Sequence, residues 1–193
     1  MIGNKLTHKQ LVNLGARWVK GLSIRDWRIL TETGYRTENP DIFAFAKYYS
    51  VLIECKASRA DFLADKKKPF RANPETGIGR RRYYLTNRGV AKQEEMPKGW
   101  QLLEAYDENT ILLPRNFTMP DTGGTEGDKE YSFHVRNASA EIELMYSWLY
   151  RKEHNCLPKI EGNKVASIHS EYWEKGDDTV NDIIKNVKKY NLY

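Results

Sequence analysis

Residues 51–62, VLIECKASRADF, constrain the fold more than any other stretch of the chain. The Val-Leu-Ile run predicts a buried strand, in which side chains alternate between the two faces of a sheet. One face then carries Val51, Ile53 and Cys55. The opposite face carries Glu54 and Lys56, an acid and a base at positions where a sheet interior normally has apolar side chains. This face needs a chemical explanation.

A hairpin places a second acid beside Glu54. The stretches PDIFAF and SVLIECK predict two strands that are joined by a tight turn at Lys47-Tyr48. Paired residues in such a hairpin have numbers that sum to 95, so Asp41 lies opposite Glu54, with Cβ atoms roughly 4.5–5.5 Å apart. Two carboxylates this close need a cation, a shared proton or separation into water.

The paired acids and the nearby lysine predict hydrolytic chemistry. Mg²⁺ or Mn²⁺ is the natural partner of Asp41 and Glu54 because hard cations prefer carboxylate oxygens. A bound metal lowers the pKa of its water, and Lys56 on the same face would orient the nucleophile or stabilise the transition state. Together these three residues predict hydrolysis of a phosphodiester bond.

The remaining sequence predicts a mixed α/β layer fold. Thr7 with Gln10 forms a capping box that begins a helix over 7–20. Ser58 with Asp61 begins a second helix, which ends at Pro69. Further strands are predicted by SIRDWRILTET, YYLT, WQLLEAY and TILLP. The expected order is a helix, three strands, a helix, a strand and another pair of strands.

The last third of the chain predicts helices. The segment 119–130 is polar and turn-rich, which predicts a flexible loop. An amphipathic helix up to about residue 153 is predicted by Ala140, Leu144 and Trp148. An apolar stripe over 180–187 predicts the final helix. We therefore expect a core over 1–118 and a helical C-terminal extension over 131–193 that packs on it.

Positive charge is concentrated between residues 56 and 92, where eleven Lys and Arg face three acids, a local charge of +8 against +5 for the whole chain. This favours an anionic partner, with nucleic acid first, although a solvated basic surface is an equally simple explanation. Residues that could contact phosphates are Arg59, Lys66, Arg80, Arg81 and Arg82. Lys67 and Lys68 are expected only to favour the negative C-terminal end of the second helix.

The sequence Pro40-Asp41, twelve intervening residues and Glu54-Cys55-Lys56 resembles the PD-(D/E)XK nuclease superfamily. The flanking stretches KASRADFLADKK and MPKGWQLLEAY are similar to the MmcB-like, DNA-repair-associated branch found in bacteria and phages. The resemblance covers residues 7–115. It implies a restriction-endonuclease-like core, which consists of a helix, a three-stranded meander, a helix and a strand.

The resemblance also implies roles for individual residues. Asp41 and Glu54 would be metal ligands, and Lys56 would be the catalytic lysine. Members of the superfamily often add an acid from the first helix or first strand, and the first helix here has none. Glu32 is therefore the expected third ligand, with Glu38 as the alternative.

Ser58 and Asp61 are expected as helix caps, and Asp61 could also orient Lys56 or Arg59 from behind the site. The implied activity is a Mg²⁺- or Mn²⁺-dependent nuclease that acts on DNA in bacterial or phage DNA metabolism, repair or defence. The alternative is an inactive nuclease-fold module that binds nucleic acid or a protein.

The location and assembly of the protein are also expectations. The start MIGNKLTHKQ lacks a signal-type apolar stretch, and two cysteines do not suggest a disulfide framework, so we expect an intracellular protein. The resemblance implies the cytoplasm of a bacterial cell, with a host or phage gene as the source. No apolar run approaches the ~20 residues of a membrane helix. A homodimer or protein contact through the C-terminal helices stays open.

Overall fold

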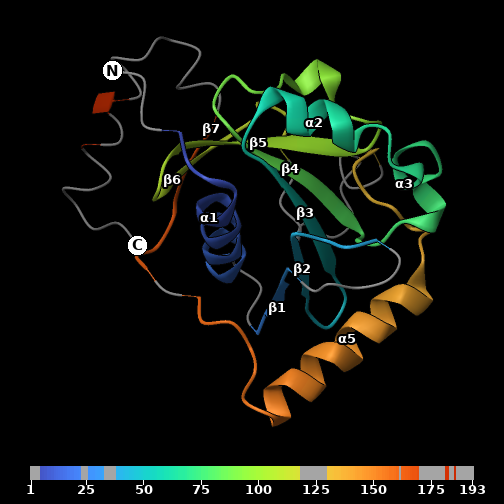
Figure 1. The fold of residues 1–193 in the computed structure, drawn as a ribbon. Coiled ribbons are helices and arrows are strands. Elements are labelled where there is room, and N and C mark those ends of the chain that lie inside the picture. Colours follow the sequence, from blue (N-terminus) through green and yellow to red (C-terminus); the bar gives the residue numbers. More distant parts are fainter. Residues whose placement is uncertain are drawn as a thin grey trace.

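A seven-stranded mixed sheet forms the centre of the computed structural model of the protein (Figure 1). The structure describes residues 5–22, 26–32, 38–117, 130–160, 162–169, 181–182 and 185. The strands are β1 (Arg28–Thr31), β2 (Ile42–Phe45), β3 (Ser50–Lys56), β4 (Arg81–Asn87), β5 (Trp100–Asp107), β6 (Thr110–Leu113) and β7 (Ala166–His169). The helices of the described residues are α1 (His8–Lys20), α2 (Arg59–Asp65), α3 (Pro69–Ala72) and α5 (Ala138–Glu153), with short 3₁₀ turns at Pro74–Thr76 and Gln93–Glu95.

The strands lie in the sheet in the order in which they occur in the chain. β1, β2 and β3 form an antiparallel meander, and β3, β4 and β5 run parallel to one another. β6 is antiparallel to β5, and β7 is parallel to β6. The expected order of a helix, three strands, a helix and a strand is therefore found, and the protein is a mixed α+β protein.

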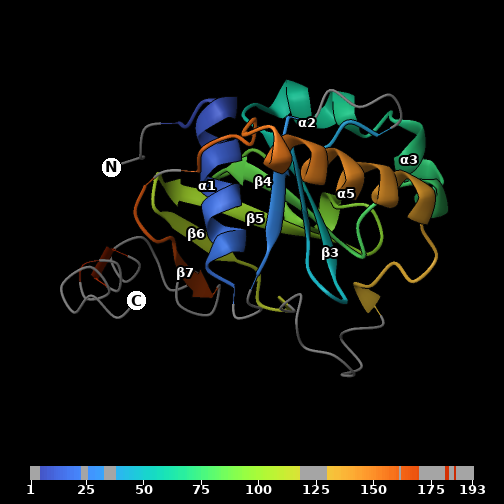
Figure 2. The same cartoon turned by 90° about the horizontal axis from the view of Figure 1, so that it is seen from below.

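Helices cover both faces of the sheet (Figures 1 and 2). On one face, α1 packs against alternate residues of the strands, and this cluster includes Leu11, Leu14, Ile53, Cys55 and Leu85. On the other face, α2 and α5 pack against the remaining set, and this cluster includes Leu52, Phe62, Tyr84, Ala140 and Leu144. Glu54 and Lys56 point to this second face, where they are almost completely buried.

The hairpin between β2 and β3 has the register that the sequence predicts. Ile42 pairs with Ile53 and Phe45 with Ser50, so the paired numbers sum to 95. Ala46 and Tyr49 exchange backbone hydrogen bonds across the turn at Lys47-Tyr48. Asp41 is the residue immediately before β2, so this register brings it to the end of β3 that carries Glu54.

Two predicted helix starts are confirmed. The hydroxyl of Thr7 accepts from the backbone N–H of Gln10, and the Gln10 side chain accepts from the backbone N–H of Thr7. Ser58 caps α2 by accepting from the backbone N–H of Asp61. Pro69 does not simply end α2, because it also begins α3, where its fixed φ suits the first helical position.

The C-terminal third is only partly as expected. The predicted helix is present as α5, and buried Glu141 ties it to the sheet by accepting from the Ser50 hydroxyl and the Gly79 N–H at 2.8 Å each. The strand β7 corrects the expectation of an exclusively helical extension. Apart from Glu130, the predicted loop at 119–130 lies outside the described residues, as does most of the predicted final helix. None of the described helices has the length and apolar composition needed to cross a membrane.

Gly79 lies between the loop after α3 and the start of β4. Substitution at this position is expected to destabilise the fold strongly. Its φ is +83°, and an added Cβ would lie 2.6 Å from the Leu52 Cβ of the adjacent strand. Gly79→Ala combines left-handed backbone strain with overpacking, so we expect a loss of about 2–4 kcal/mol in the free energy of unfolding. Urea unfolding followed by tryptophan fluorescence measures this loss.

Gly89→Ala is the matched control. Gly89 has a φ of +75°, but an added Cβ would meet nothing within 4 Å. Only the backbone term of about 1–2 kcal/mol then applies. Equal losses in the two variants would contradict the assignment of a close approach between Gly79 and β3.

Candidate active site

Seven charged side chains gather on the sheet face beneath α2. We call this group the charged cluster. Its acids are Glu38, Asp41, Glu54 and Asp65, and its cations are Lys56, Lys68 and Arg71. Glu54 and Lys56 lie on β3, and Asp65 is the last residue of α2. Lys68 and Arg71 lie in the short segment that follows α2.

Lys56 lies at the centre of three acids. Its Nζ donates to Glu54 Oε2 at 2.8 Å, and it lies 3.2 Å from Asp65 Oδ1 and 3.5 Å from Asp41 Oδ2. Burial lowers the pKa of this ammonium group, but Glu54, Asp41 and Asp65 outweigh the burial and raise the pKa of Lys56 well above its ordinary value. The three acids therefore favour the charged form of Lys56 in this arrangement.

Glu54 is a fully buried carboxylate. Besides Lys56, it has Arg71 Nη2 at 3.2 Å from Oε1 and Lys68 Nζ at 3.4 Å from Oε2. A buried charge requires such partners, because the solvation free energy that an ion loses on leaving water is not replaced by an apolar protein interior.

Asp65 is held from several directions. Its Oδ2 accepts from Arg71 Nε at 2.8 Å and from the Tyr84 hydroxyl at 2.5 Å, and its Oδ1 lies 2.7 Å from Lys68 Nζ. Burial raises the pKa of Asp65, but Arg71 and Lys56, together with the nearby Lys68 ammonium and the Tyr84 hydroxyl, lower it well below the ordinary range. Asp65 is therefore ionised across the range in which proteins are folded.

Arg71 connects the inner acids. It forms ion pairs with Glu38 at 2.7 Å, Asp65 at 2.8 Å and Glu54 at 3.2 Å, and its side chain is only 3% exposed. Burial lowers the pKa of Arg71, and the surrounding acids, with Glu54 first, reverse this effect and raise it. Its guanidinium also lies over the Trp100 ring, 4.4 Å from the centroid.

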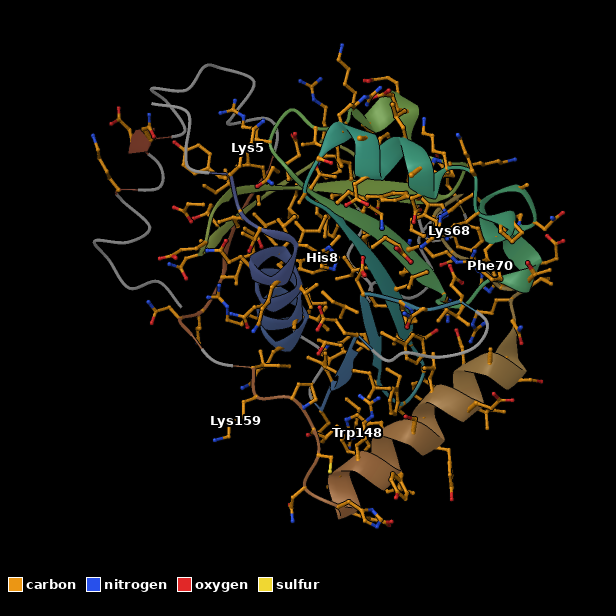
Figure 3. The ribbon with its side chains drawn as sticks, in the orientation of Figure 1. Lys5, His8, Lys68, Phe70, Trp148 and Lys159 are labelled. Carbon is orange, nitrogen blue, oxygen red and sulfur yellow. The ribbon has the colours of Figure 1, made fainter. Side chains whose placement is uncertain are left out.

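Asp41 forms the more open side of the charged cluster, with 19% of its side chain exposed. Its Oδ2 accepts from the Cys55 N–H at 2.7 Å, and its Oδ1 lies 3.5 Å from His8 Nε2 at the start of α1. Figure 3 labels His8 and Lys68, which approach the charged cluster from different elements. Lys68 is 39% exposed, so it lies where the cluster meets solvent.

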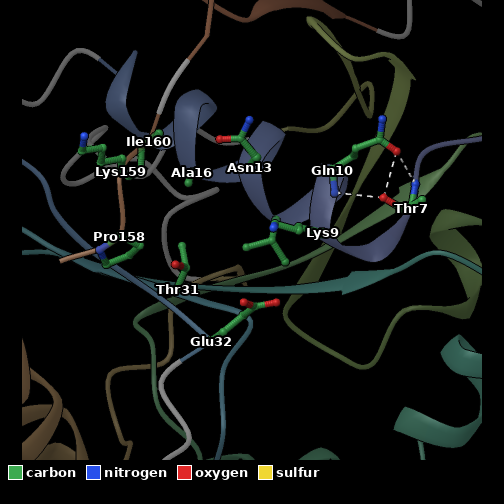
Figure 4. Close-up of a pocket in the computed structure, with 11 residues that line it drawn as sticks. Thr7, Lys9, Gln10, Asn13, Ala16, Thr31, Glu32, Pro158, Lys159 and Ile160 are labelled. Carbon is green, nitrogen blue, oxygen red and sulfur yellow. Dashed lines mark hydrogen bonds between the residues drawn. The ribbon is translucent and has the colours of Figure 1, made fainter. Parts of the chain in front are cut away.

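The structure thus brings together Asp41, Glu54 and Lys56, the three residues on which the sequence interpretation depends. Glu32 lies next to Asp41, because its backbone N–H donates to the Asp41 carbonyl at 3.1 Å, but its side chain is not part of the charged cluster. Glu32 is exposed and lines a pocket of about 420 Å³ with Lys9, Thr31 and Lys159 (Figure 4). The alternative acid, Glu38, does join the charged cluster, where it accepts from Arg71 and from the Ile78 N–H.

The predicted phosphate-binding residues are spread over different surroundings. Arg59 begins α2 and Lys66 follows its last residue, and both lie over the Phe62 ring. Arg59 pairs with Glu95, and the Arg59 hydrogen bonds lower the pKa of Glu95 to about 2. Asp61 is exposed on the first turn of α2.

The three consecutive arginines are mostly not surface residues. Arg81 and Arg82 are each 1% exposed, because β4 begins earlier than the predicted YYLT strand and includes both. Arg82 donates to the carbonyls of Gly79 and Pro74, and burial lowers its pKa to about 10. Arg80 is partly exposed and lies over the Tyr49 ring. This placement favours structural roles for Arg81 and Arg82 over phosphate contacts.

Sequence reasoning missed Asp65, Arg71 and Tyr84, and it assigned Lys68 only to the helix end. The spacing of Phe62 and Asp65 carried a signal, since residues three apart share a helix face and Phe62 is an obvious core residue. Lys68 and Arg71 carried no comparable signal, because the turn from α2 into α3 determines where they point.

The acids have the donor chemistry that a divalent metal prefers, but the cations of the charged cluster compete with it. Glu54 Oε1 and Asp65 Oδ1 are buried and accept no hydrogen bond of good geometry, although both have cations close by. Lys56 lies among the three acids, and the described residues contain no ready group of three ligands. Asp41 and Glu54 fit a metal if Lys68, whose side chain is 39% exposed, moves away from Glu54 while Lys56 stays beside both acids.

Comparison of the chain with protein-family models, curated proteins and solved structures gives no match. The chemistry of the charged cluster therefore has to be judged from its own geometry.

Arg71→Met tests the energetic importance of the charged cluster. The substitution leaves Glu38, Glu54 and Asp65 buried without their shared guanidinium, so we expect a loss of about 3–5 kcal/mol in the free energy of unfolding. Arg59→Met removes an exposed pair with Glu95 and is expected to change stability little. Chemical denaturation of both variants provides the comparison, and equal losses would contradict a central role for Arg71.

The lowered pKa of Asp65 predicts a particular acid sensitivity. The unfolded chain binds this proton near the ordinary Asp pKa of about 3.9, whereas the folded chain resists it. The contribution of Asp65 to stability is therefore complete above that value and is lost as the pH falls toward the lower folded pKa. Asp65→Asn should flatten the dependence of unfolding free energy on pH in this acid range. Asp61→Asn, at an exposed position on the first turn of α2, is the control measured beside it.

Proposed function

We propose that this protein is a metal-dependent nuclease that hydrolyses phosphodiester bonds of DNA, with Asp41, Glu54 and Lys56 at its centre. The observation that carries this proposal is the approach of the Lys56 ammonium to both carboxylates, at 2.8 Å from Glu54 and 3.5 Å from Asp41. These are the residues that resemble the PD-(D/E)XK pattern. The element order α1, β1 to β3, α2, β4 is also the order of that superfamily's core.

Each residue has a role that its surroundings support. Asp41 and Glu54 would hold Mg²⁺ or Mn²⁺, which when bound supplies an activated water and neutralises charge on the phosphate. Lys56, whose ammonium group lies beside both carboxylates, would stabilise negative charge in the transition state or orient the attacking water. Lys68, at the exposed side, is the cluster cation that an approaching phosphate meets first.

Contacts to the DNA backbone are proposed for exposed cations beside the charged cluster. Arg59 begins α2 and Lys66 directly follows it, and both are exposed. The positive charge of the segment 56–92 would attract the phosphate backbone in a manner that weakens with salt. These contacts would orient the strand across the cluster.

The second candidate is a catalytically inactive module of the same fold that binds nucleic acid. One observation favours it: the acids are already paired with cations inside the protein, and Lys56 lies between Asp41, Glu54 and Asp65. Such pairing would stabilise the fold without any metal. Both candidates predict binding of DNA, and only the nuclease predicts cleavage.

The test is incubation of the purified protein with supercoiled plasmid and with single-stranded DNA, in Mg²⁺, in Mn²⁺ and in chelator. We expect metal-dependent cleavage that Asp41→Asn and Lys56→Met reduce by at least about 100-fold, because each removes a group that acts in the transition state. Glu75→Gln, an exposed acid outside the charged cluster, is the control and should retain activity. Salt-sensitive DNA binding without cleavage would overturn the nuclease and support the inactive module.

A further inference from the structure

We propose that Asp65 is the positioning residue for Lys56: the carboxylate at the end of α2 holds the ammonium group in place above Glu54 and Asp41. This inference rests on the proposed nuclease function, and it identifies a residue that the motif pattern does not contain. It starts from the position of Asp65 Oδ1, which lies 3.2 Å from Lys56 Nζ.

Lys56 needs a partner outside its own strand pair. A lysine side chain has four rotatable carbon–carbon bonds, so a single contact does not fix its ammonium group. Glu54 is two residues away on β3, and Asp41 is on the neighbouring chain segment across the hairpin. Asp65 belongs to α2, which packs over this sheet face through Phe62. Contacts from these separate elements define a position for Nζ that strand contacts alone would leave loose.

Asp65 can fix another group because it is itself fixed. Its side chain is 2% exposed. Tyr84 of β4 donates its hydroxyl to Oδ2, and Arg71 donates Nε to the same oxygen. The opposite oxygen, Oδ1, is thereby turned toward Lys56 and Lys68. Rigid support of this kind is what precise catalytic geometry requires, since a displacement of about 1 Å can cost about 100-fold in rate.

Lys68 does not take over this positioning role. It lies 2.7 Å from the same Asp65 oxygen, but its side chain is 39% exposed, compared with 6% for Lys56. The interaction of Asp65 with Lys68 is therefore at the solvent boundary, where an incoming anion or cation can replace it. The interaction with Lys56 is inside the protein and persists.

A double-mutant cycle tests the proposal. The variants are Asp65→Asn, Lys56→Met and the double substitution, assayed for single-turnover cleavage of DNA with Mn²⁺. We expect Asp65→Asn to reduce the rate ten- to 100-fold in the wild-type background and to add less than a twofold reduction in the Lys56→Met background. Independent losses that multiply would show that Asp65 does not act through Lys56 and would overturn the proposal.

Tyr84→Phe provides a variant that keeps the charge of Asp65. The substitution removes only the hydroxyl that orients Oδ2, so the fold is expected to persist. We expect a three- to tenfold decrease in kcat with little change in KM for DNA or in the Mn²⁺ concentration that gives half-maximal rate. A higher Mn²⁺ concentration for half-maximal rate, without a fall in kcat, would identify Asp65 as a metal ligand and would overturn the positioning role.

The outcomes separate this inference from the proposed function. If the wild type cleaves no DNA in any metal, the nuclease proposal fails, and the role of Asp65 falls with it. If the wild type cleaves and Tyr84→Phe and Asp65→Asn both match the wild type, the nuclease proposal stands and Asp65 has no positioning role. Glu75→Gln, carried through the same assays, measures the effect of removing an acid outside the charged cluster.

Discussion

A carboxylate with no access to water, Glu54, sets the conditions that the surrounding structure has to meet. Its ionised form would be very costly without compensating charge, because solvent does not reach it. Lys56 and Arg71 supply the compensating charge. Arg71 in turn needs Glu38 and Asp65, so one buried acid determines the contacts of β3, α2 and the segment that follows α2.

This arrangement of charge is consistent with the packing of the two sheet faces. The face toward α1 is filled with apolar side chains, and the face toward α2 combines the charged cluster with aromatic rings. Tyr84 joins the two kinds of contact, since its ring packs on Phe62 and Trp100 while its hydroxyl binds Asp65. An apolar replacement of the whole cluster could be as stable, because buried ion pairs seldom exceed well-packed apolar residues in stability. Stability alone therefore does not explain why this face carries charged side chains.

Local sequence signals predicted a large part of the fold. The capping box at Thr7, the alternation in residues 50–56 and the tight turn at Lys47-Tyr48 are properties of neighbouring residues, and each has the predicted consequence. The hairpin register also placed Asp41 at the end of the strand that carries Glu54 and Lys56 before any tertiary contact was known. These features could be predicted because the period of a strand and the length of a turn decide them.

The features that could not be predicted depend on contacts between distant segments. β7 pairs with β6 in a parallel arrangement, and its short sequence ASIH has no pattern that distinguishes it from a loop. Arg81 and Arg82 read as surface cations, yet the strand begins at Arg81 and the neighbouring segments cover both side chains. Asp65, Lys68 and Arg71 meet only because α2 ends in a tight turn into α3. No rule based on sequence spacing predicts the contacts among these three residues.

The two-residue turn between β2 and β3 has a consequence for how this chain can vary. Lengthening both strands of a hairpin adds one residue on each side, so the interval between Asp41 and Glu54 can grow or shrink by two without separating the acids. A change of one residue would either require a bulge or turn Glu54 toward the apolar core. The number of residues between the two acids, twelve here, can therefore change, but it should stay even. Chains that share this site should differ in this number by two or by a multiple of two.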